Sequence, residues 1–393
     1  MTDSSATIRA CTDADIDGVV ALIADRIGTE DAAEARIVLE DPSFDRQRWT
    51  VAVAGTEVVS TMANFRADLT VGTTAMAATM IEFVATARAF ENRGLIRGQF
   101  AYHHDLAAAR GEIVQFIVGI PYFYRRFGYE LAIPMPAYRF VASADVPPAP
   151  DGWDVRDASA KDLDAIMALQ RACAEAADVR LSATAEMRSW YLESPAHRVR
   201  VAEHAGRIGA AWRVTDEDGP LVHDLAATGP EGVAAALHDA AGGDFAVVPR
   251  VATSRWLEPY GVTAPVAYAY YVRIGDPATF VRALASELER RLSASGMGDE
   301  AGELLISLYT SSLTISYASG RITAVTPGPR MQAPVSAGGS GVPPDAFAAL
   351  ALGPLTVDEL DARLPDFLPG KPRDLLSALF PGLSSDIDSW VPP

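Results

Sequence analysis

Residues 80–97 combine a strand-like apolar run with an Arg-Gly pair, a pattern suited to binding an anion. Met80–Thr86 has the composition of a buried strand, and Arg93-Gly94 opens a segment in which apolar residues recur at helical spacing. Glycine at such a turn lets backbone N–H groups converge on one point, and the N-terminus of a helix adds partial positive charge. The sequence therefore predicts a cradle for a pyrophosphate, with an ordinary turn as the alternative.

A second segment, Gly119–Glu130, concentrates aromatic and basic residues. Four aromatic side chains lie between Ile120 and Phe127, and Gly128 has the position of a glycine that ends a helical turn before a return strand. The aromatic residues fit a hydrophobic core as well as a site. A tyrosine, with a pKa near 10, is also a suitable proton donor to a thiolate of somewhat lower basicity.

Both segments lie in the first part of a chain that repeats itself. Ile8–Leu22 matches Val155–Leu169 at a constant offset, and each copy has the pattern of a strand, a turn with a capping Thr or Ser, and a helix with acids in its first turn. The proline-rich stretch Ala144–Gly152 separates the copies as a linker. A length of 393 residues fits two or three domains. We expect domains at residues 1–146, 151–272 and 273–393.

The elements that must position these segments follow from apolar periodicity. Strands are expected at Trp49–Val53, Val58–Leu69, Ala75–Val84 and Ile113–Val118, and a helix is expected to begin near Gly94. In the third region we expect a helix through Phe280–Leu292, strands at Leu304–Leu308 and Leu313–Tyr317, a loop at Ser336–Pro344, and helices at Asp345–Leu352 and Val357–Leu364. Phe380–Pro393 is rich in Pro, Gly and Ser, so we expect no regular element there.

Together the two segments resemble the GCN5-related N-acetyltransferase (GNAT) superfamily. Residues 80–97 resemble its acetyl-CoA motif, a strand, then (Arg/Gln)-x-x-Gly-x-(Gly/Ala), then a helix. Residues 124–130, Tyr-Arg-Arg-Phe-Gly-Tyr-Glu, resemble the late motif whose tyrosine faces the thioester. The layout of the whole chain is similar to the Eis-type (enhanced intracellular survival) acetyltransferases. This resemblance implies an α/β (α+β) chain with tandem GNAT folds and a C-terminal sterol-carrier-protein-like α+β domain.

The resemblance also implies roles for residues where the motifs match. Acetyl-CoA would be held at the strand end, in the cradle and at the start of the tyrosine segment, by Val84, Ala85, Thr86, Asn92, Arg93, Gly94, Leu95, Ile96, Arg97, Gly119 and Ile120. Tyr124 would be the general acid, and a backbone N–H near Ala85 would stabilise the oxyanion. The base in Eis-like enzymes is the C-terminal carboxylate, here that of Pro393. Glu82 is a rival base, or else the ion-pair partner of a neighbouring arginine.

The sequence departs from the family pattern in several places. Glu91 stands where Arg or Gln is usual, so we expect its carboxylate to point away from a bound pyrophosphate. Ile96 replaces the small third residue of the motif, and the chain ends in Pro-Pro where relatives end in an aromatic residue. The second copy lacks the Arg-x-x-Gly pattern after Ala227 and has Leu257 in the place of the tyrosine. The second domain is therefore expected to be a scaffold.

Composition narrows the partners. With 33 Lys+Arg against 51 Asp+Glu, the net charge of −18 disfavours nucleic acid and anionic membrane surfaces and favours cations. Two cysteines cannot form a disulfide framework, and neither a secretory signal nor a membrane-spanning run is present, so a cytoplasmic protein is expected. The run His103-His104-Asp105 is expected to be a solvated helix face, and no metal is expected.

We therefore expect an acetyl-CoA-dependent N-acetyltransferase that acts on a small cationic amine, aminoglycoside-like or lysine-like. By resemblance it would assemble as a homo-oligomer, a hexamer. The alternative is a vestigial GNAT scaffold that acts as a lipid-binding or assembly protein.

Overall fold

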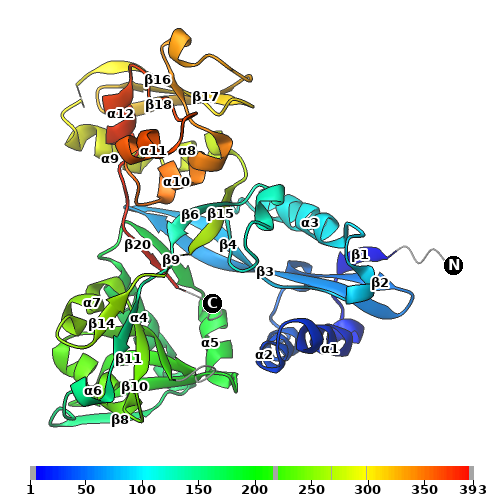
Figure 1. Ribbon diagram of the computed structural model, residues 1–393, viewed down its shortest axis with the longest axis vertical. Coiled ribbons are helices and arrows are strands. Elements are labelled where there is room, and N and C mark those ends of the chain that lie inside the picture. Colours follow the sequence, from blue (N-terminus) through cyan, green and yellow to red (C-terminus); the bar gives the residue numbers. More distant parts are fainter. Residues whose placement is uncertain (1–5, 216–219, 267, 298, 389–393) are drawn as a thin grey trace.

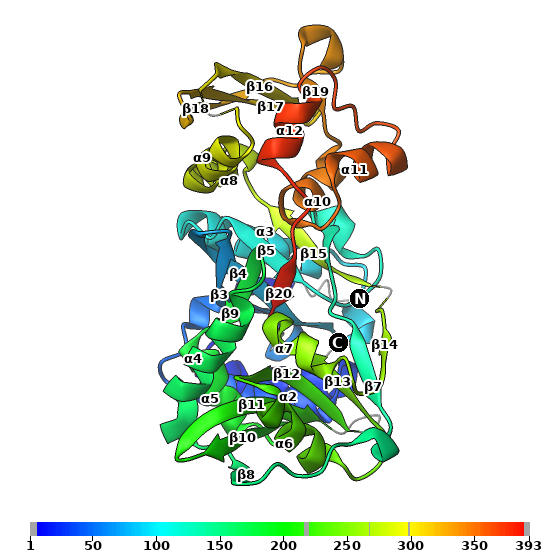
Figure 2. The same cartoon turned by 90° about the vertical axis from the view of Figure 1, so that its left-hand side faces the viewer.

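The computed structural model describes residues 6–215, 220–266, 268–297 and 299–388 (Figures 1 and 2). Over these residues the chain is a mixed α/β protein with three sheets. The first sheet (mostly blue to cyan) lies near the middle of the long axis, between the second sheet (green) at one end and the third region (yellow to red) at the other (Figures 1 and 2). None of the described helices is long and apolar enough to cross a bilayer.

The first sheet carries the segments singled out in the sequence. Its path runs through β1 (Thr7–Ala10), β2 (Trp49–Ala54), β3 (Glu57–Val71), β4 (Thr74–Thr86), β5 (Val114–Ile117), β15 (Ala269–Ile274) and β6 (Glu130–Pro134). Along this path only the β4–β5 pair is parallel. Helix α3 (Leu95–Ala109) covers one face, and α1 (Ile16–Arg26) and α2 (Thr29–Glu40) cover the other (Figure 1).

The second sheet has the same order of strands, and the two sheets exchange one strand with each other. It runs through β8 (Trp153–Asp157), β10 (Arg198–His204), β11 (Arg207–Thr215), β12 (Leu221–Ala227), β13 (Phe245–Pro249), β7 (Tyr138–Val141) and β14 (Val262–Ala264), and again one pair, β12–β13, is parallel. The sixth strand of each sheet comes from the other half of the chain. The expected limits of 1–146, 151–272 and 273–393 stay predictions, and hydrogen bonding crosses them at β7 and β15.

The internal repeat has a physical counterpart in the two helix starts. Thr12 and Asp15 form a capping box, and the Asp15 carboxylate also accepts a hydrogen bond from Arg9 at 2.6 Å. Ser159 and Asp162 form the same box, with Arg156 at 2.7 Å. Helices α1 and α4 (Leu163–Ala174) follow these caps directly. Capping residues and acids at these positions stabilise the helix N-terminus, as the sequence predicted.

Among the described residues, the region of the second sheet has three further helices, and two strands link this region to the first sheet. The helices are α5 (Ala185–Glu193), α6 (Pro230–Ala240) and α7 (Val251–Leu257). Strand β9 (Val179–Ala183) pairs with the distal half of β3, and β20 (Ser385–Ile387) pairs with β9 in parallel. The expectation of an irregular tail is therefore wrong at β20. Local composition cannot report a strand whose partner lies two hundred residues away.

The third region consists of a sheet and a set of short helices. The sheet runs through β18 (Arg321–Gly328), β17 (Ser312–Ala318), β16 (Ala301–Ser307) and β19 (Ser340–Gly341), and the helices are α8 (Pro277–Ala283), α9 (Ala285–Ala294), α10 (Phe347–Leu352), α11 (Val357–Arg363) and α12 (Arg373–Leu379). The stretch expected as a loop at 336–344 contains the two-residue strand β19. One continuous apolar core joins this region to the first sheet.

Because β15 lies between β5 and β6 but comes from the second half of the chain, we predict that residues 6–135 cannot fold alone. A chain of residues 6–135 leaves β5 and β6 without the strand between them, so we expect no cooperative thermal unfolding, measured by circular dichroism. A second chain, in which residues 6–135 are joined to residues 268–276 through an Asn-Gly linker, should unfold cooperatively. That junction recreates the antiparallel β6–β15 hairpin, where the Met135 N–H already donates to the Tyr268 carbonyl. Equal behaviour of the two chains would contradict the prediction.

Candidate functional site

The site is built where two parallel strands part. The β4–β5 ladder begins at Ala78–Val114 and ends at Ile81–Ile117. Beyond it β4 continues to Thr86, while the chain after β5 turns away into Gly119, which has φ +128°. Backbone groups on this edge of β4 therefore lose their partner strand and face a gap.

A β-bulge turns the end of β4 within this gap. Ala63 pairs with Glu82 and Thr61 with Ala85, so β4 holds one extra residue, and Phe83 there has φ 53°. The Ala87 N–H donates to Val59 of β3, and the Ala85 carbonyl accepts from Ser60 Oγ at 2.9 Å. Because backbone groups alternate along a strand, those of Val84 and Thr86 face the gap instead.

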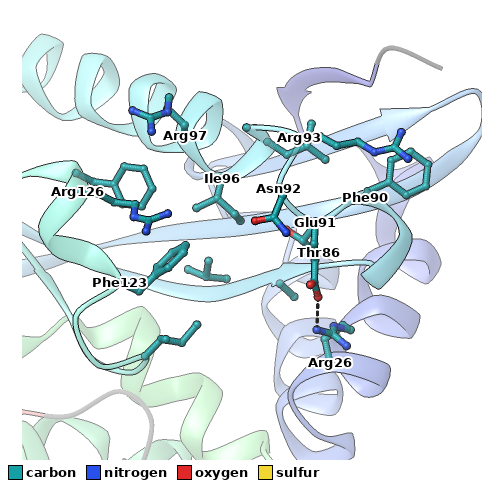
Figure 3. Close-up of a pocket in the computed structure, with 16 residues that line it drawn as sticks. Arg26, Thr86, Phe90, Glu91, Asn92, Arg93, Ile96, Arg97, Phe123 and Arg126 are labelled. Atoms are coloured by element: carbon teal, nitrogen blue, oxygen red, sulfur yellow. Dashed lines mark hydrogen bonds and ion pairs between the residues drawn. The ribbon is translucent and has the colours of Figure 1, made fainter. Parts of the chain in front are cut away.

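One cavity, of about 650 Å³, opens on the α3 side of the gap. It is lined by every residue expected to hold acetyl-CoA except Gly119, namely Val84, Ala85, Thr86, Asn92, Arg93, Gly94, Leu95, Ile96, Arg97 and Ile120 (Figure 3). Asn92 and Gly94 have φ 61° and 80°, so the chain turns sharply before α3. The first N–H groups of α3 have no partner within the helix, and they supply the donors of an anion cradle.

The cradle is positively charged within an acidic protein. Arg26, Arg93, Arg97 and Arg126 line the cavity, against one carboxylate, that of Glu91. The guanidinium groups of Arg93, Arg97 and Arg126 lie 4.5, 5.9 and 5.2 Å from the ring centres of Phe90, Phe127 and Phe123. Sequence reasoning identified Arg93 and Arg97. It missed Arg126, although its segment had been singled out, and Arg26, which comes from α1.

Two cradle residues, Glu91 and Ile96, differ from the family pattern, and the structure shows where each one lies. Glu91 lines the cavity, and its carboxylate forms an ion pair with Arg26 at 2.8 Å (Figure 3). Pairing with Arg26 compensates a charge that would otherwise repel a bound anion. Ile96 stands on the cavity wall at the start of α3 (Figure 3).

A second cavity, of about 530 Å³, opens on the other side of the gap. Arg26, Val84 and Ile120 line both cavities, so the two meet at the parted strands. The second cavity is also bounded by two carboxylate side chains and three tyrosines, which are Asp31, Glu82, Tyr124, Tyr268 and Tyr270. Gly119, expected to contact acetyl-CoA, lies on this second wall.

Tyr124 begins a 3₁₀ turn that ends at Gly128, and its side chain is buried. A Cβ on Gly119 would lie 3.2 Å from the Tyr124 hydroxyl, so the phenol packs directly against the chain leaving β5. Burial and the nearby Glu82 carboxyl raise the pKa of Tyr124, while a hydrogen bond with the Ile120 backbone acts in the opposite direction. The hydroxyl therefore stays protonated throughout the neutral range.

The exchanged strand β15 and the residue before it fix the loop that carries Tyr124. The Tyr122 N–H donates to the Tyr271 hydroxyl at 2.7 Å, and the Tyr268 hydroxyl donates to the Gly119 carbonyl. The Tyr270 hydroxyl is buried at the second cavity without a hydrogen-bond partner among the described residues. Sequence reasoning missed these tyrosines, because nothing local links residues 268–271 to the first domain.

Glu82 faces the second cavity from the residue before the bulge. Burial raises the pKa of its carboxyl to about 8, and the negative charges of Asp31 and Glu34 add to the increase. No ion pair joins Glu82 to an arginine among the described residues, so that alternative finds no support there. Pro393, the expected source of the base, lies outside the described residues.

The histidine pair is not the solvated face that the sequence predicted. His103 is fully buried, with Nε2 3.0 Å from Thr50 Oγ1, and burial lowers its pKa to about 3. His104 contacts the Tyr129 hydroxyl at 3.3 Å. Within the described ranges no group of three or more His, Cys, Asp or Glu is placed to hold a metal ion.

Comparison with known proteins agrees with this geometry. Residues 7–132 match the family described as an acetyltransferase (GNAT) domain. No curated protein matches the chain.

Several solved structures share the fold over nearly the whole chain. A GCN5-related N-acetyltransferase from Kribbella flavida is 19% identical with a TM-score of 0.69, and 98% of this chain and 100% of that one are covered. One from Anabaena variabilis is 13% identical with a TM-score of 0.72, covering 98% and 99%. Eis1 from Mycobacterium abscessus is 16% identical with a TM-score of 0.64, covering 98% and 99%. These findings support an acetyltransferase enzyme, and the expected fold class is confirmed.

The raised pKa of Glu82 makes stability depend on pH. The native carboxyl keeps its proton up to about pH 8, whereas the unfolded chain loses it near 4.5. Between these values the native state binds more protons, so the free energy of unfolding falls as pH rises, by up to about 1.4 kcal/mol per pH unit from this group. Glu82→Gln should flatten the dependence, measured by urea unfolding at pH 5.5 and 7.5. Glu57→Gln, at an exposed position, should leave the slope unchanged. Equal slopes for wild type and Glu82→Gln would contradict the prediction.

Proposed function

We propose that this chain, through its GNAT acetyltransferase domain, transfers an acetyl group from acetyl-CoA to a primary amine of a small cationic acceptor, aminoglycoside-like or lysine-like. The observation that carries the proposal is the meeting of the two cavities at Val84 and Ile120, with the Tyr124 hydroxyl on the second cavity's wall. A vestigial scaffold has no need of a cradle and a tyrosine brought together in this way.

The first cavity suits the nucleotide end of acetyl-CoA. A pyrophosphate suits the cradle of Asn92–Arg97, where backbone donors and three arginines offset the net charge of −18, while Arg26 is balanced by Glu91. The free edge of β4 at Val84 and Thr86 offers backbone groups to the amide-bearing arm of the cofactor. Acetyl-CoA supplies the thioester whose acetyl group is transferred.

Two groups at the gap act on the charge that develops during acetyl transfer, the N–H of Val84 and the hydroxyl of Tyr124. The N–H of Val84 faces the gap, so we assign the oxyanion hydrogen bond to Val84 rather than to Ala85. Tyr124 holds a proton at neutral pH and donates it to the departing thiolate. Ile120 and Gly119 keep the phenol at the end of β5.

The second cavity suits a cationic acceptor. Asp31 places a carboxyl group on its wall, and Tyr268 and Tyr270 add aromatic rings that attract ammonium groups. The Glu82 carboxyl is uncharged below about pH 8 and offers hydrogen bonds there rather than a negative charge. Arg26 is its one basic lining residue, and Arg26 is paired with Glu91.

The amine must lose a proton before it attacks, and we propose the C-terminal carboxylate of Pro393 as the base, with Glu82 as its rival. Glu82 faces the cavity and has a pKa of about 8, which suits proton transfer from an ammonium group. We further propose the domain limits given above, a sterol-carrier-protein-like third domain, and assembly as a homohexamer.

Acetyl-CoA affinity should depend on the cradle arginines. Arg97→Ala and Arg126→Ala should each raise the Kd of acetyl-CoA about tenfold, since each removes a charged partner of the phosphates. Isothermal titration measures the Kd at two salt concentrations, and the loss should shrink in high salt. Arg36→Ala, which removes a surface arginine paired with Asp17 and Glu40, is the matched control. An unchanged Kd in both cradle variants would refute the assignment.

Tyr124→Phe tests the general acid. It should lower kcat about a hundredfold and leave the KM of acetyl-CoA nearly unchanged, because the hydroxyl acts on the leaving group. Release of CoA thiol over a panel of amines gives both constants. Tyr129→Phe removes a buried hydroxyl of the same aromatic cluster that bonds His104 instead, and it should retain activity. Thiol release by neither wild type nor variant, with any amine, would overturn the proposed function.

The two candidate bases give different kinetic signatures. If the base is the Pro393 carboxylate, extending the chain by one glycine lowers kcat and Glu82→Gln leaves the acidic limb of the pH profile in place. If the base is Glu82, the extension has no effect, and Glu82→Gln abolishes the rise in kcat toward pH 8. The same thiol-release measurement between pH 6 and 9 decides between them.

A further inference from the structure

Three arginines and three aspartates form a buried cluster where the C-terminal strand meets the second domain. Its members are Arg188, Arg213, Arg250, Asp224, Asp386 and Asp388, and each is at most 7% exposed. Arg213 pairs with Asp224 at 2.9 Å, Arg250 pairs with Asp386 at 3.0 Å, and Arg188 pairs with Asp388. Positive and negative charges balance, as a buried cluster requires.

Two of the three acids belong to the last described residues of the chain. Asp386 lies in β20 and also accepts a hydrogen bond from the Val251 N–H at 2.8 Å. Asp388 follows β20, and its carboxylate accepts from the Ala183 N–H at 3.1 Å while its own N–H donates to Leu181. Without this strand, the three buried arginines would share a single carboxylate, that of Asp224. The cluster is therefore neutral only while the C-terminal strand is seated in it.

The strand is seated at the second domain's counterpart of the active-site gap. In β12, Arg213 pairs with His223 and Ala211 with Ala226, so Asp224 is the extra residue and has φ 52°. This is the same bulge that Phe83 forms in β4. Here the gap is closed, because pairing continues past the bulge to Leu225–Pro249 and the Arg250 N–H donates to Leu225.

Met135 stands between the seated strand and the acceptor cavity of the first domain. Met135 lines that cavity and a smaller one of about 200 Å³, whose walls include Ser385, Asp386 and Ile387. The charges of both Glu82 and Asp388 are close enough to Tyr270 to affect its phenol. Five residues follow Asp388, and an extended chain of five spans at most about 17 Å.

We propose that Arg188 and Arg250 are positioning residues, which clamp the C-terminal strand through Asp388 and Asp386 and so hold the end of the strand on the Met135 side of the acceptor cavity. Where the first domain has an open gap between strands, the second domain thus has a closed ladder with the C-terminal strand seated beside it. This inference rests on the proposed role of the C-terminal carboxylate as the base. The clamp would set the effective concentration of that carboxylate at the amine.

The test removes the clamp and then asks whether the length of the tail still matters. Asp386→Asn/Asp388→Asn leaves the arginines in place. Arg188→Met/Asp388→Leu replaces one pair with apolar residues of similar size, so the fold is kept without an unpaired charge. Glu112→Gln breaks a comparable buried pair, with Arg48, that lies away from the strand, and it is the control. Each variant is made with and without one added C-terminal glycine, and one further chain ends at Asp388.

Two readouts separate positioning from structure. Hydrogen exchange of residues 383–388 should quicken in both clamp variants and not in Glu112→Gln. In thiol release the clamp variants should lose about tenfold in kcat with the KM of acetyl-CoA unchanged, and the added glycine should then cost them little more. Glu112→Gln should keep the full penalty of the added glycine.

The results distinguish failure of the clamp from failure of the proposed base. Full turnover in the chain ending at Asp388 would remove the C-terminal carboxylate as base, and the positioning role with it. Loss of turnover in that chain, with wild-type kcat in both clamp variants, would overturn the clamp alone. Unchanged hydrogen exchange in the clamp variants would overturn it as well.

Discussion

The site depends on the point at which β4 and β5 stop pairing. Four residues of each strand form a parallel ladder, and after Ile81 and Ile117 the strands part. Backbone hydrogen-bonding groups left without a strand are costly unless a ligand or water satisfies them, so the parted strands favour a binding site. The bulge at Phe83 then turns Val84 and Thr86 toward the gap, and both cavities and Tyr124 lie around it.

Strand exchange makes this gap a property of the whole chain. Strand β15 lies between β5 and β6. Tyr268, just before this strand, and Tyr271, within it, hold the loop that carries Tyr124. The wall of the second cavity that carries Tyr268 and Tyr270 therefore forms only when the second half of the chain has folded against the first. The second sheet depends in the same way on the first half of the chain, since that half supplies strand β7.

The two halves of the chain share one sheet architecture but differ in the residue at the β-bulge. Both sheets have the same strand order and the same bulge, yet the residue at the bulge is Phe83 in one and Asp224 in the other. A buried carboxylate needs counterions, and Arg213 and Arg250 approach it there. In the structure, Asp386 and Asp388 of the C-terminal strand supply the further counterions beside this closed gap.

The sequence by itself determined what local chemistry encodes. The repeat with its helix caps, the strands of the first domain, and the cradle around Arg93 and Gly94 follow from periodicity, capping and glycine conformation, which act over a few residues. Only the tertiary structure decided which distant residues join them. Arg26 neutralises Glu91, β15 delivers its tyrosines, and β20 forms because β9 and buried arginines receive it. These pairings join segments tens to hundreds of residues apart, and their free energy comes from burial and charge neutralisation that no local pattern records.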